Sequence, residues 1–361
     1  MCFLKEKMGK NKLLIKTERL VEIYDNDLDH FNIDFEGQKV KVFFGKGILE
    51  KTLKKILGSH KLNTTFSESY KPVEIKKKDI DEKFGTSNDS CFIVSLGGAS
   101  AMDQGKIMRN KDDSLRLISI PTSCSNDAFF TNKYTNPGPK KGGSSALSGK
   151  LPDYVIVDVD LIDGLVNDEI IYSGWGEFLS IISSFNDWKN GNGEDCSLAD
   201  VKILDKLTKK MMEDSKKVFD NGDFNNINVL MKLLFMKCLY MLVYDDNTIG
   251  ASSDHMVGYG LKESGFAQNQ RHGQQVMFGS ILACACYDIL DSSNLVSLLP
   301  KQFVEYIMGI GEFNELIDVS KLKELLTVSR KTRNRKTIFD RLPEDKSFYE
   351  KLEETIMKLK A

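Results

Sequence analysis

The chain has 361 residues, longer than one hydrophobic core usually extends, so two domains are expected. Its composition, 41% hydrophobic and 28% charged, is typical of globular proteins and excludes a largely disordered chain. The net charge of −2 argues against a general nucleic-acid-binding protein. The sequence also contains no apolar run of about 18 residues that would span a membrane. We therefore expect neither nucleic acid nor a membrane as a partner.

The seven cysteines give no sign of a disulfide framework or a cysteine–zinc site, because their number is odd and no Cys-x-x-Cys pair occurs. Cys91, Cys238, Cys284 and Cys286 stand in apolar runs, where a thiol behaves as a small hydrophobic group. The N-terminal residues carry charges and lack the apolar stretch of a signal peptide. These features predict a cytoplasmic protein with reduced thiols.

The N-terminal part of the chain alternates short β-rich runs with helical patterns. Strands are predicted at 40–44, 91–94, 115–120 and 155–158, and a helix with 3.6-residue periodicity at 48–57. This alternation predicts parallel βαβ units in an open sheet. Residues 136–145 are rich in glycine, proline and serine and have strands on both sides, which indicates a mobile hairpin or loop over a cleft. Residues 1–163 are expected to form an α/β domain.

From about residue 164 the pattern becomes helical, with few convincing strands. The predicted helices cover residues 170–185, 198–212, 226–244, 276–290, 319–328 and 347–359. Residues 164–361 are therefore expected to form a second, all-α domain.

Gly97 and Gly98 follow a predicted strand and precede a predicted helix. Without side chains, such a turn lets the backbone approach a pyrophosphate, and the helix presents its positive end to it. The bland alternative is an ordinary glycine turn with Ser100 as the N-cap of the helix. Asp103 and Lys106 then fall in the first turns of that helix.

A second polar segment follows the predicted strand 115–120. In open α/β sheets the carboxyl ends of the strands point into the ligand crevice, so Thr122, Ser125 and Asp127 could contact a cofactor or a substrate there. The alternative is a polar turn in which Asp127 binds nearby backbone groups. Lys133, six residues further on, is either another residue of the crevice or a surface lysine.

The strongest chemical signal is one carboxylate and two imidazoles, Glu177, His255 and His272. This combination is a common three-ligand set for a catalytic divalent metal with an open coordination position. Each histidine alone is more often a structural residue. Two of only four histidines near the starts of successive helices favour a metal site.

Taken together, these segments resemble the iron-containing alcohol dehydrogenase / dehydroquinate synthase superfamily, and most of all its sn-glycerol-1-phosphate dehydrogenase and glycerol dehydrogenase branches. The resemblance extends from about residue 40 to residue 340. The order and spacing of its motifs are specific, although each motif alone is a weak signal. The motifs that carry it are residues 97–106, 120–127, 174–177, 187–188, 253–255, 272–279 and 333–339.

The resemblance implies a dehydroquinate synthase-like fold, with an N-terminal dinucleotide-binding domain and a helical catalytic domain on either side of the active site. It implies a divalent metal, zinc with iron or nickel as alternatives, held by Glu177, His255 and His272. It also implies NAD or NADP, a three-carbon polyol or polyol phosphate as substrate, and a homo-oligomer. Asp127 and Lys133 would act at the substrate. The implied cofactor-binding residues are Gly97, Gly98, Ala99, Ser100, Asp103, Thr122, Ser123 and Ser125.

Several positions depart from the family pattern. Glu177 stands where the glycerol and glycerol phosphate dehydrogenases usually have aspartate, Tyr259 replaces a second histidine, and Gln274 replaces a frequent glutamate. The arginine often found before the first metal histidine is missing. Lys133 and Arg271 are then the nearest candidates to bind a substrate phosphate.

Two other functions stay open. Glu177 and the spacing of Lys133 fit an NAD-dependent cyclase of the dehydroquinate synthase type, but Ser180 stands where that class needs a lysine. The departures at Tyr259 and Gln274 are also compatible with a nucleotide-binding relative that has lost its metal.

Overall fold

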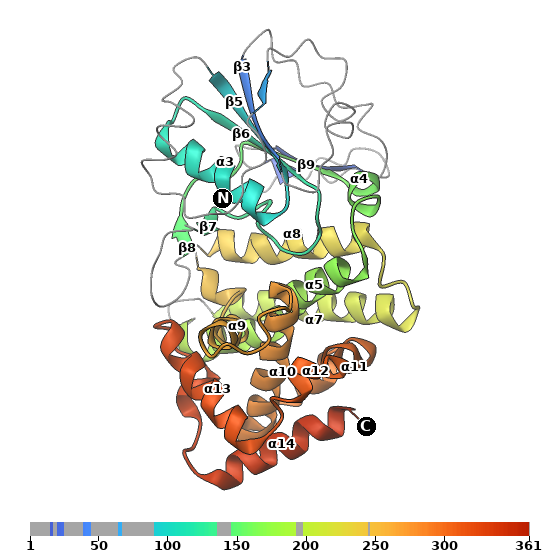
Figure 1. The fold of residues 1–361 in the computed structure, drawn as a ribbon, viewed down its shortest axis with the longest axis vertical. Helices are drawn as coiled ribbons and strands as arrows, with labels where there is room; N and C mark the ends of the chain where they lie inside the picture. The colour runs from blue at the N-terminus through green and yellow to red at the C-terminus, as the bar shows by residue number, and fades with distance from the viewer. Residues whose placement is uncertain are drawn as a thin grey trace. The chain divides into compact units, whose positions relative to one another are not determined.

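The computed structural model describes residues 15–16, 20–24, 39–44, 64–66, 90–135, 146–192, 198–244 and 246–360. The chain divides into two compact units, Met1–Asn167 and Asp168–Ala361, four residues beyond the boundary proposed from the sequence. Figure 1 shows the strands of the first unit and the helices of the second. No helix among the described residues has the length and apolar character needed to cross a bilayer.

The first unit is built on a seven-stranded sheet with the strand order β1-β2-β9-β6-β5-β3-β4. All neighbouring strands run parallel except β1 and β2, so the predicted open parallel sheet is confirmed. The strands are β1 Ile15–Lys16, β2 Leu20–Tyr24, β3 Lys39–Phe44, β4 Thr64–Phe66, β5 Ser90–Gly97, β6 Arg116–Pro121 and β9 Tyr154–Asp158.

The strand order creates a switch point between β3 and β5. The chain leaves β3 toward β4 at one edge of the sheet, whereas it leaves β5 toward β6 on the other side. Ligands of open α/β sheets bind beside the carboxyl ends of the strands at such a point. β5 ends there at Gly97, and helix α3 (Ala99–Lys111) follows and packs on β5 and β6 (Figure 1). A short helix, α4 (Val159–Asp163), follows β9.

A two-stranded hairpin follows the polar segment after β6. Its strands, β7 (Lys133–Thr135) and β8 (Ala146–Ser148), pair antiparallel, which agrees with the hairpin predicted around residues 136–145, themselves outside the described residues. The fully buried Lys106 of α3 fixes this hairpin, because its Nζ donates to the Lys133 carbonyl oxygen at 2.7 Å and to Thr131 Oγ1 at 3.1 Å.

The second unit consists of helices. They are α5 Asp168–Leu179, α6 Ile181–Asp187, α7 Leu198–Asp220, α8 Ile227–Val243, α9 Ser253–Glu263, α10 His272–Asp291, α11 Lys301–Gly309, α12 Gly311–Asn314, α13 Val319–Thr332 and α14 Lys346–Lys360.

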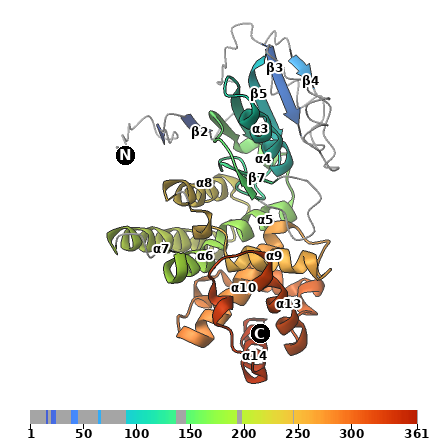
Figure 2. The same ribbon diagram turned by 90° about the vertical axis from the view of Figure 1, so that its left-hand side faces the viewer.

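Helix α10 is the core of this unit. It contacts α5, α9, α11 and α14, and its residues from Gly273 to Tyr287 are all buried. Figure 2 shows α9, α10 and α13 side by side. A helix that is apolar on all sides must be surrounded by protein, and each large side chain removed from water contributes about 1.5–3 kcal/mol. Cys238, Cys284 and Cys286 are fully buried, as predicted.

Most predicted elements are confirmed, with changed boundaries. The predicted helix 170–185 is two helices, α5 and α6, separated at Ser180. Helix α10 begins at His272, four residues before the predicted start, and α11 was missed. The predicted helix 48–57 lies outside the described residues.

Candidate metal centre

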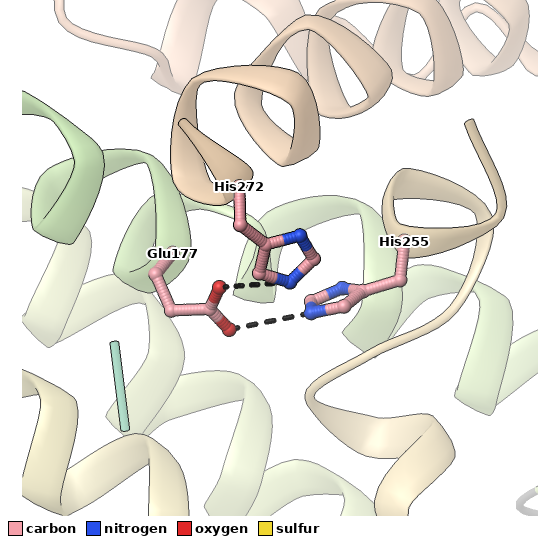
Figure 3. Close-up of side chains that lie close together, drawn as sticks. All are labelled: Glu177, His255 and His272. Carbon is pink, nitrogen blue, oxygen red and sulfur yellow. Dashed lines mark ion pairs between the residues drawn. The ribbon is translucent and has the colours of Figure 1, made fainter. Parts of the chain in front are cut away.

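Three helices bring Glu177, His255 and His272 together, as predicted. Glu177 lies near the end of α5, His255 is the third residue of α9 and His272 is the first of α10. The His255 Nε2 atom is 3.3 Å from Glu177 Oε1, and the His272 Nε2 atom is 3.7 Å from Glu177 Oε2. Figure 3 shows the three side chains pointing toward one another. One ligand atom from each lies within 4.8 Å of the others, so one ion can contact all three.

Two glycines allow this close approach. Gly176 precedes Glu177, and Gly273 follows His272. A Cβ atom at Gly176 would lie 2.1 Å from the Gly273 carbonyl oxygen, and one at Gly273 would lie 1.8 Å from the Ser173 carbonyl oxygen. Because these neighbours are backbone atoms, a side chain at either position would push α5 and α10 apart. The glycines therefore set the distance between the Glu177 carboxylate and the His272 imidazole.

The His255 ring is oriented by a buried carboxylate. Its Nδ1 atom contacts Asp254 Oδ1. Asp254 is fully buried and also accepts hydrogen bonds from Ser184 Oγ at 2.5 Å and Ser183 Oγ at 3.0 Å. A carboxylate on the far nitrogen of a histidine fixes its tautomer and makes it a better metal ligand. Asp254 belongs to the motif at residues 253–255, but the sequence pattern alone assigns it no role.

Lys237, a fully buried residue of α8, is a site residue that the sequence pattern did not predict. Its Nζ lies 2.8 Å from Glu177 Oε1, 2.5 Å from the Glu177 carbonyl oxygen and 3.0 Å from Ser180 Oγ. These bonds coincide with the break between α5 and α6, where the Glu177 carbonyl also accepts a bond from Ser180 Oγ. The only available signal was a lysine inside the apolar run of α8, a helix that also carries Lys232.

The charges around Glu177, His255 and His272 decide which of these three side chains are ionised. Burial raises the pKa of Glu177, but the positive charge of Lys237, followed by that of His255, holds this pKa well below its usual value. Burial lowers the pKa of His255, but Glu177 and Asp254 raise it more. For His272, burial lowers the pKa more than Glu177 raises it, so this imidazole is neutral and able to bind a metal.

The residues present fit a divalent metal. Glu177 Oε2 is buried and has no hydrogen-bond partner among the described residues, although a buried carboxylate oxygen normally has one. A bound cation would satisfy this atom. Two imidazole nitrogens and one carboxylate oxygen are ligands that zinc, iron and nickel accept. The His272 side chain is 37% exposed, so the centre is open on that side.

Asp187 holds the segment that carries His255. It is buried, and its carboxylate accepts hydrogen bonds from Ser253 N at 3.0 Å, Tyr287 Oη at 2.8 Å and Ile338 N at 2.8 Å. These bonds join the start of α9 to α10 and to the loop after α13. Through its bond to Ser253, two residues before His255, Asp187 thus helps to position the His255 side chain. Burial outweighs these bonds and raises the pKa of Asp187 to about 7.

This pKa predicts a pH dependence of stability. Unfolded Asp187 loses its proton near the usual 3.8, whereas folded Asp187 keeps it to about 7. Because the folded state holds this proton more tightly than the unfolded state, proton binding stabilises the fold. This stabilisation is fully present below pH 3.8 and is lost as the pH rises to about 7. Between pH 5 and 7 we expect Asp187 to lower the free energy of unfolding by about 2 kcal/mol.

Denaturant titrations of the wild type and Asp187→Asn at both pH values measure this slope. The free energy of unfolding of Asp187→Asn should not show the decrease that Asp187 causes in the wild type between these two pH values, whatever the overall stability of the variant. Asp318→Asn is the control, because hydrogen bonds from its helix start lower the pKa of Asp318 and it stays ionised throughout this range. Equal slopes for the wild type and Asp187→Asn would refute the assignment.

The predicted cofactor residues of the first unit lie together at the ends of β5 and β6. Gly97 has a φ of 153°, which favours glycine, and Gly98 is the N-cap of α3. Thr122 N donates to the Gly97 carbonyl oxygen at 3.0 Å, joining the two loops. Ala99 and Ser100 form the first turn of α3, so Ser100 is not its N-cap. The loop after β6 also carries Ser123 and Ser125, whose hydroxyl oxygens are 2.9 Å apart.

Asp103, Asp127 and Lys133 lie near this loop pair. Asp103 accepts a hydrogen bond from Thr135 N at 3.0 Å, and the charge of Asp127 helps to raise the pKa of Asp103 after the larger effect of burial. Lys133 Nζ donates to Ser148 Oγ at 2.6 Å across the hairpin. Their proposed roles at the cofactor and substrate stay predictions.

The departures from the family pattern have local explanations. Gln274 completes the start of α10, because its Oε1 accepts from Arg271 N at 2.9 Å and its Nε2 donates to Tyr306 Oη at 2.7 Å. Arg271, one of the two phosphate candidates, is exposed and lies 3.5 Å from Glu169. Tyr259 accepts a hydrogen bond from Arg333 Nη2 at 2.5 Å.

The architecture is that of the iron-containing alcohol dehydrogenases and their relatives. A probable glycerol dehydrogenase from Sinorhizobium meliloti 1021 superposes with a TM-score of 0.62 at 18% identity, covering 90% of this chain and 91% of that one. An iron-containing alcohol dehydrogenase from Thermotoga maritima superposes with a TM-score of 0.55 at 16% identity, covering 90% and 92%. The predicted dehydroquinate synthase-like fold is confirmed.

The curated relatives that match this chain are glycerol-1-phosphate dehydrogenases. The chain is similar to glycerol-1-phosphate dehydrogenase [NAD(P)+] of Archaeoglobus fulgidus, 24% identical over 240 residues, which is 66% of each protein. The same enzyme of Methanococcus maripaludis (strain C7) is 21% identical over 286 residues, 73% of this chain and 79% of the relative. The match spans 66% of the length of the Archaeoglobus fulgidus enzyme, 34% of that from Methanococcus vannielii and 63% of that from Methanococcus maripaludis (strain S2 / LL). No family model matches the chain. The resemblance predicted from the motifs is nonetheless confirmed by the relatives' names.

Proposed function

We propose that this protein is a metal- and NAD(P)-dependent dehydrogenase that interconverts an alcohol and a carbonyl group in a three-carbon polyol or its phosphate. The observation that carries the proposal is the convergence of Glu177, His255 and His272 around an unpartnered carboxylate oxygen. The names of the curated relatives and of the solved glycerol dehydrogenases support the substrate class.

Each residue of the helical unit then has a task. Glu177, His255 and His272 bind the metal, which when present acts as a Lewis acid on the substrate oxygen. Asp254 holds the His255 ring, and Lys237 fixes the Glu177 side chain so that Oε2 stays available. The half-exposed His272 leaves one side of the centre accessible to a substrate.

The first unit would bind the nicotinamide cofactor. The backbone N–H groups that follow Gly97 and Gly98 suit a pyrophosphate, and Thr122, Ser123 and Ser125 suit the nicotinamide side. The cofactor supplies or accepts the hydride, and the protein sets its orientation. Asp127 would bind a neighbouring substrate hydroxyl, with Lys133 nearby. Residues 45–47, after β3, include no acidic side chain and a single lysine, so the sequence does not distinguish NAD from NADP. These residues lie outside the described part of the chain.

An oxidation assay tests the proposal. Zinc-loaded protein should oxidise NADH or NADPH in the presence of dihydroxyacetone phosphate or dihydroxyacetone, and a chelator should abolish the reaction. Iron- and nickel-loaded protein, assayed in parallel, identify the metal. No metal-dependent oxidation with either substrate would refute the proposed function.

The cyclase of the dehydroquinate synthase type is the second candidate. One observation favours it, because the Lys237 ammonium lies 3.0 Å from Ser180 Oγ, where that class has a lysine. The ammonium also binds two atoms of Glu177, so it is held by protein groups. Turnover of a phosphorylated seven-carbon substrate without net NADH consumption would favour the cyclase. Protein that binds no metal would favour the nucleotide-binding relative.

We further propose that the protein acts in the cytoplasm as a homo-oligomer.

A further inference from the structure

Lys237 of α8 is held in one place by the protein around it. Its side chain is fully buried, and its Nζ atom lies 2.5 Å from the Glu177 carbonyl oxygen, 2.8 Å from Glu177 Oε1 and 3.0 Å from Ser180 Oγ. An ammonium group has three N–H bonds, so these three acceptors can use all of them. A Cβ atom at Gly250 would lie 3.2 Å from Lys237 Cε, so the aliphatic stem is closely packed as well. Lys237 is therefore placed to act on Glu177 and not on a substrate.

The two oxygens of the Glu177 carboxylate have different surroundings. Oε1 accepts a hydrogen bond from Lys237 at 2.8 Å and lies 3.3 Å from His255 Nε2. Oε2 is buried, has no hydrogen-bond partner among the described residues and lies 3.7 Å from His272 Nε2. Figure 3 shows the two oxygens facing different histidines. Oε2 is therefore the oxygen that is available to a cation.

The positive charge of Lys237 opposes a second cation at Oε1. Like charges repel, and the low dielectric constant of a buried site strengthens the repulsion. The side chains of Lys237 and Glu177 are only 0% and 4% exposed, so water screens the ammonium charge little. A carboxylate that binds a metal through both oxygens would need Oε1 as well as Oε2. Lys237 disfavours this mode of binding.

The number of protein ligand atoms decides whether a metal can also bind a substrate. With Glu177 bound through Oε2 alone, the protein supplies three ligand atoms, one from each of Glu177, His255 and His272. Catalytic zinc sites have three protein ligands and keep the fourth position for water or substrate. Glu177 Oε1, as a fourth protein atom, would occupy that position.

We propose that Lys237 is a positioning residue that reserves Glu177 Oε1, so that this carboxylate binds the metal through Oε2 alone and one coordination position stays open for the substrate oxygen. The inference rests on the proposed metal-dependent function and adds a residue to it. It also implies that Lys237 weakens metal binding, since its charge repels the metal and it withholds one ligand atom.

The visible absorption of cobalt(II) tests the proposal, because four-coordinate cobalt absorbs strongly and five- or six-coordinate cobalt absorbs weakly. Wild-type protein loaded with cobalt should show the strong four-coordinate spectrum. Lys237→Met, purified with the metal present, should bind cobalt through both oxygens of Glu177, and its absorption per bound cobalt should fall severalfold. Its zinc affinity, measured by competition with a chromophoric chelator, should rise at least about tenfold. Lys237→Gln should change both quantities in the same direction and serves if the methionine variant does not fold.

Lys232→Met is the matched control, because Lys232 is an exposed lysine of the same helix. Its cobalt spectrum and zinc affinity should equal those of the wild type. A purely structural role of Lys237 would lower the amount of cobalt bound but leave the absorption of each bound ion unchanged. Such an unchanged spectrum in the Lys237 variants, or a weak six-coordinate spectrum in the wild type, would overturn the proposal.

These measurements need no substrate, so they separate this inference from the dehydrogenase function. Four-coordinate cobalt in the wild type and a weaker spectrum in Lys237→Met would support the role of Lys237 even if neither dihydroxyacetone nor its phosphate is reduced. Wild-type protein that binds neither cobalt nor zinc would overturn both.

Discussion

Replacing His272 with alanine should lower kcat/KM by at least about 1,000-fold, and His255→Ala should do the same, because the metal's electrostatic stabilisation amounts to several kcal/mol. Both variants remove one of three ligands whose binding atoms lie within 4.8 Å of one another. His272→Ala is the cleaner test, because this side chain is 37% exposed and its loss leaves little cavity. Activity is measured at saturating zinc, with circular dichroism to follow the fold.

A matched control separates ligand loss from general damage. Lys301→Ala changes an exposed side chain at the start of α11 and should keep full activity. The melting temperature of His272→Ala in chelator should stay within about 2 °C of the wild type. Near-normal turnover by either histidine variant, with unchanged metal content, would exclude the proposed ligand role.

Replacing Lys237 with methionine should destabilise the metal-free protein by about 3–5 kcal/mol, because it leaves the buried Glu177 carboxylate without its partner. The pair is almost completely inaccessible to solvent, with side-chain exposures of 0% and 4%. Zinc should reduce the loss, since a divalent cation compensates the same negative charge. Urea unfolding with and without zinc measures both effects.

The double variant Lys237→Met/Glu177→Gln completes the test. It should be more stable than Lys237→Met alone, because the uncompensated charge is gone. Lys210→Met is the control: Lys210 and Asp214 form a similarly close pair at 2.7 Å on the surface of α7, and loss of this pair should have little effect. A similarly small effect of Lys237→Met would show that the buried pair contributes no more to the free energy of unfolding than the surface pair does.

Local sequence pattern predicted most elements well, and it singled out the three side chains that meet at the candidate metal centre, whose role as ligands stays a prediction. Apolar runs marked β5 and β6, and the glycine turn after β5 is where the motif placed it. The start of α10 was less visible, because residues 272–275 are polar or glycine and the apolar run begins at Val276. The helix extends back to His272 through a bond from Arg271 N to Gln274 and through backbone contact at Gly273.

The remaining features depend on contacts between distant residues. Lys237 binds Glu177, 60 positions earlier, and Arg333 binds Tyr259, 74 positions earlier. No periodicity encodes such pairs. Arg333 belongs to the motif at residues 333–339, but its contact with Tyr259 follows only from the packing of α13 on α9.

The metal content of the purified protein tests the central claim most directly. After dialysis against zinc and removal of free metal, elemental analysis should find one zinc per wild-type chain and almost none in Glu177→Gln/His255→Ala/His272→Ala. A full equivalent of zinc in the triple variant, or none in the wild type, would contradict the account.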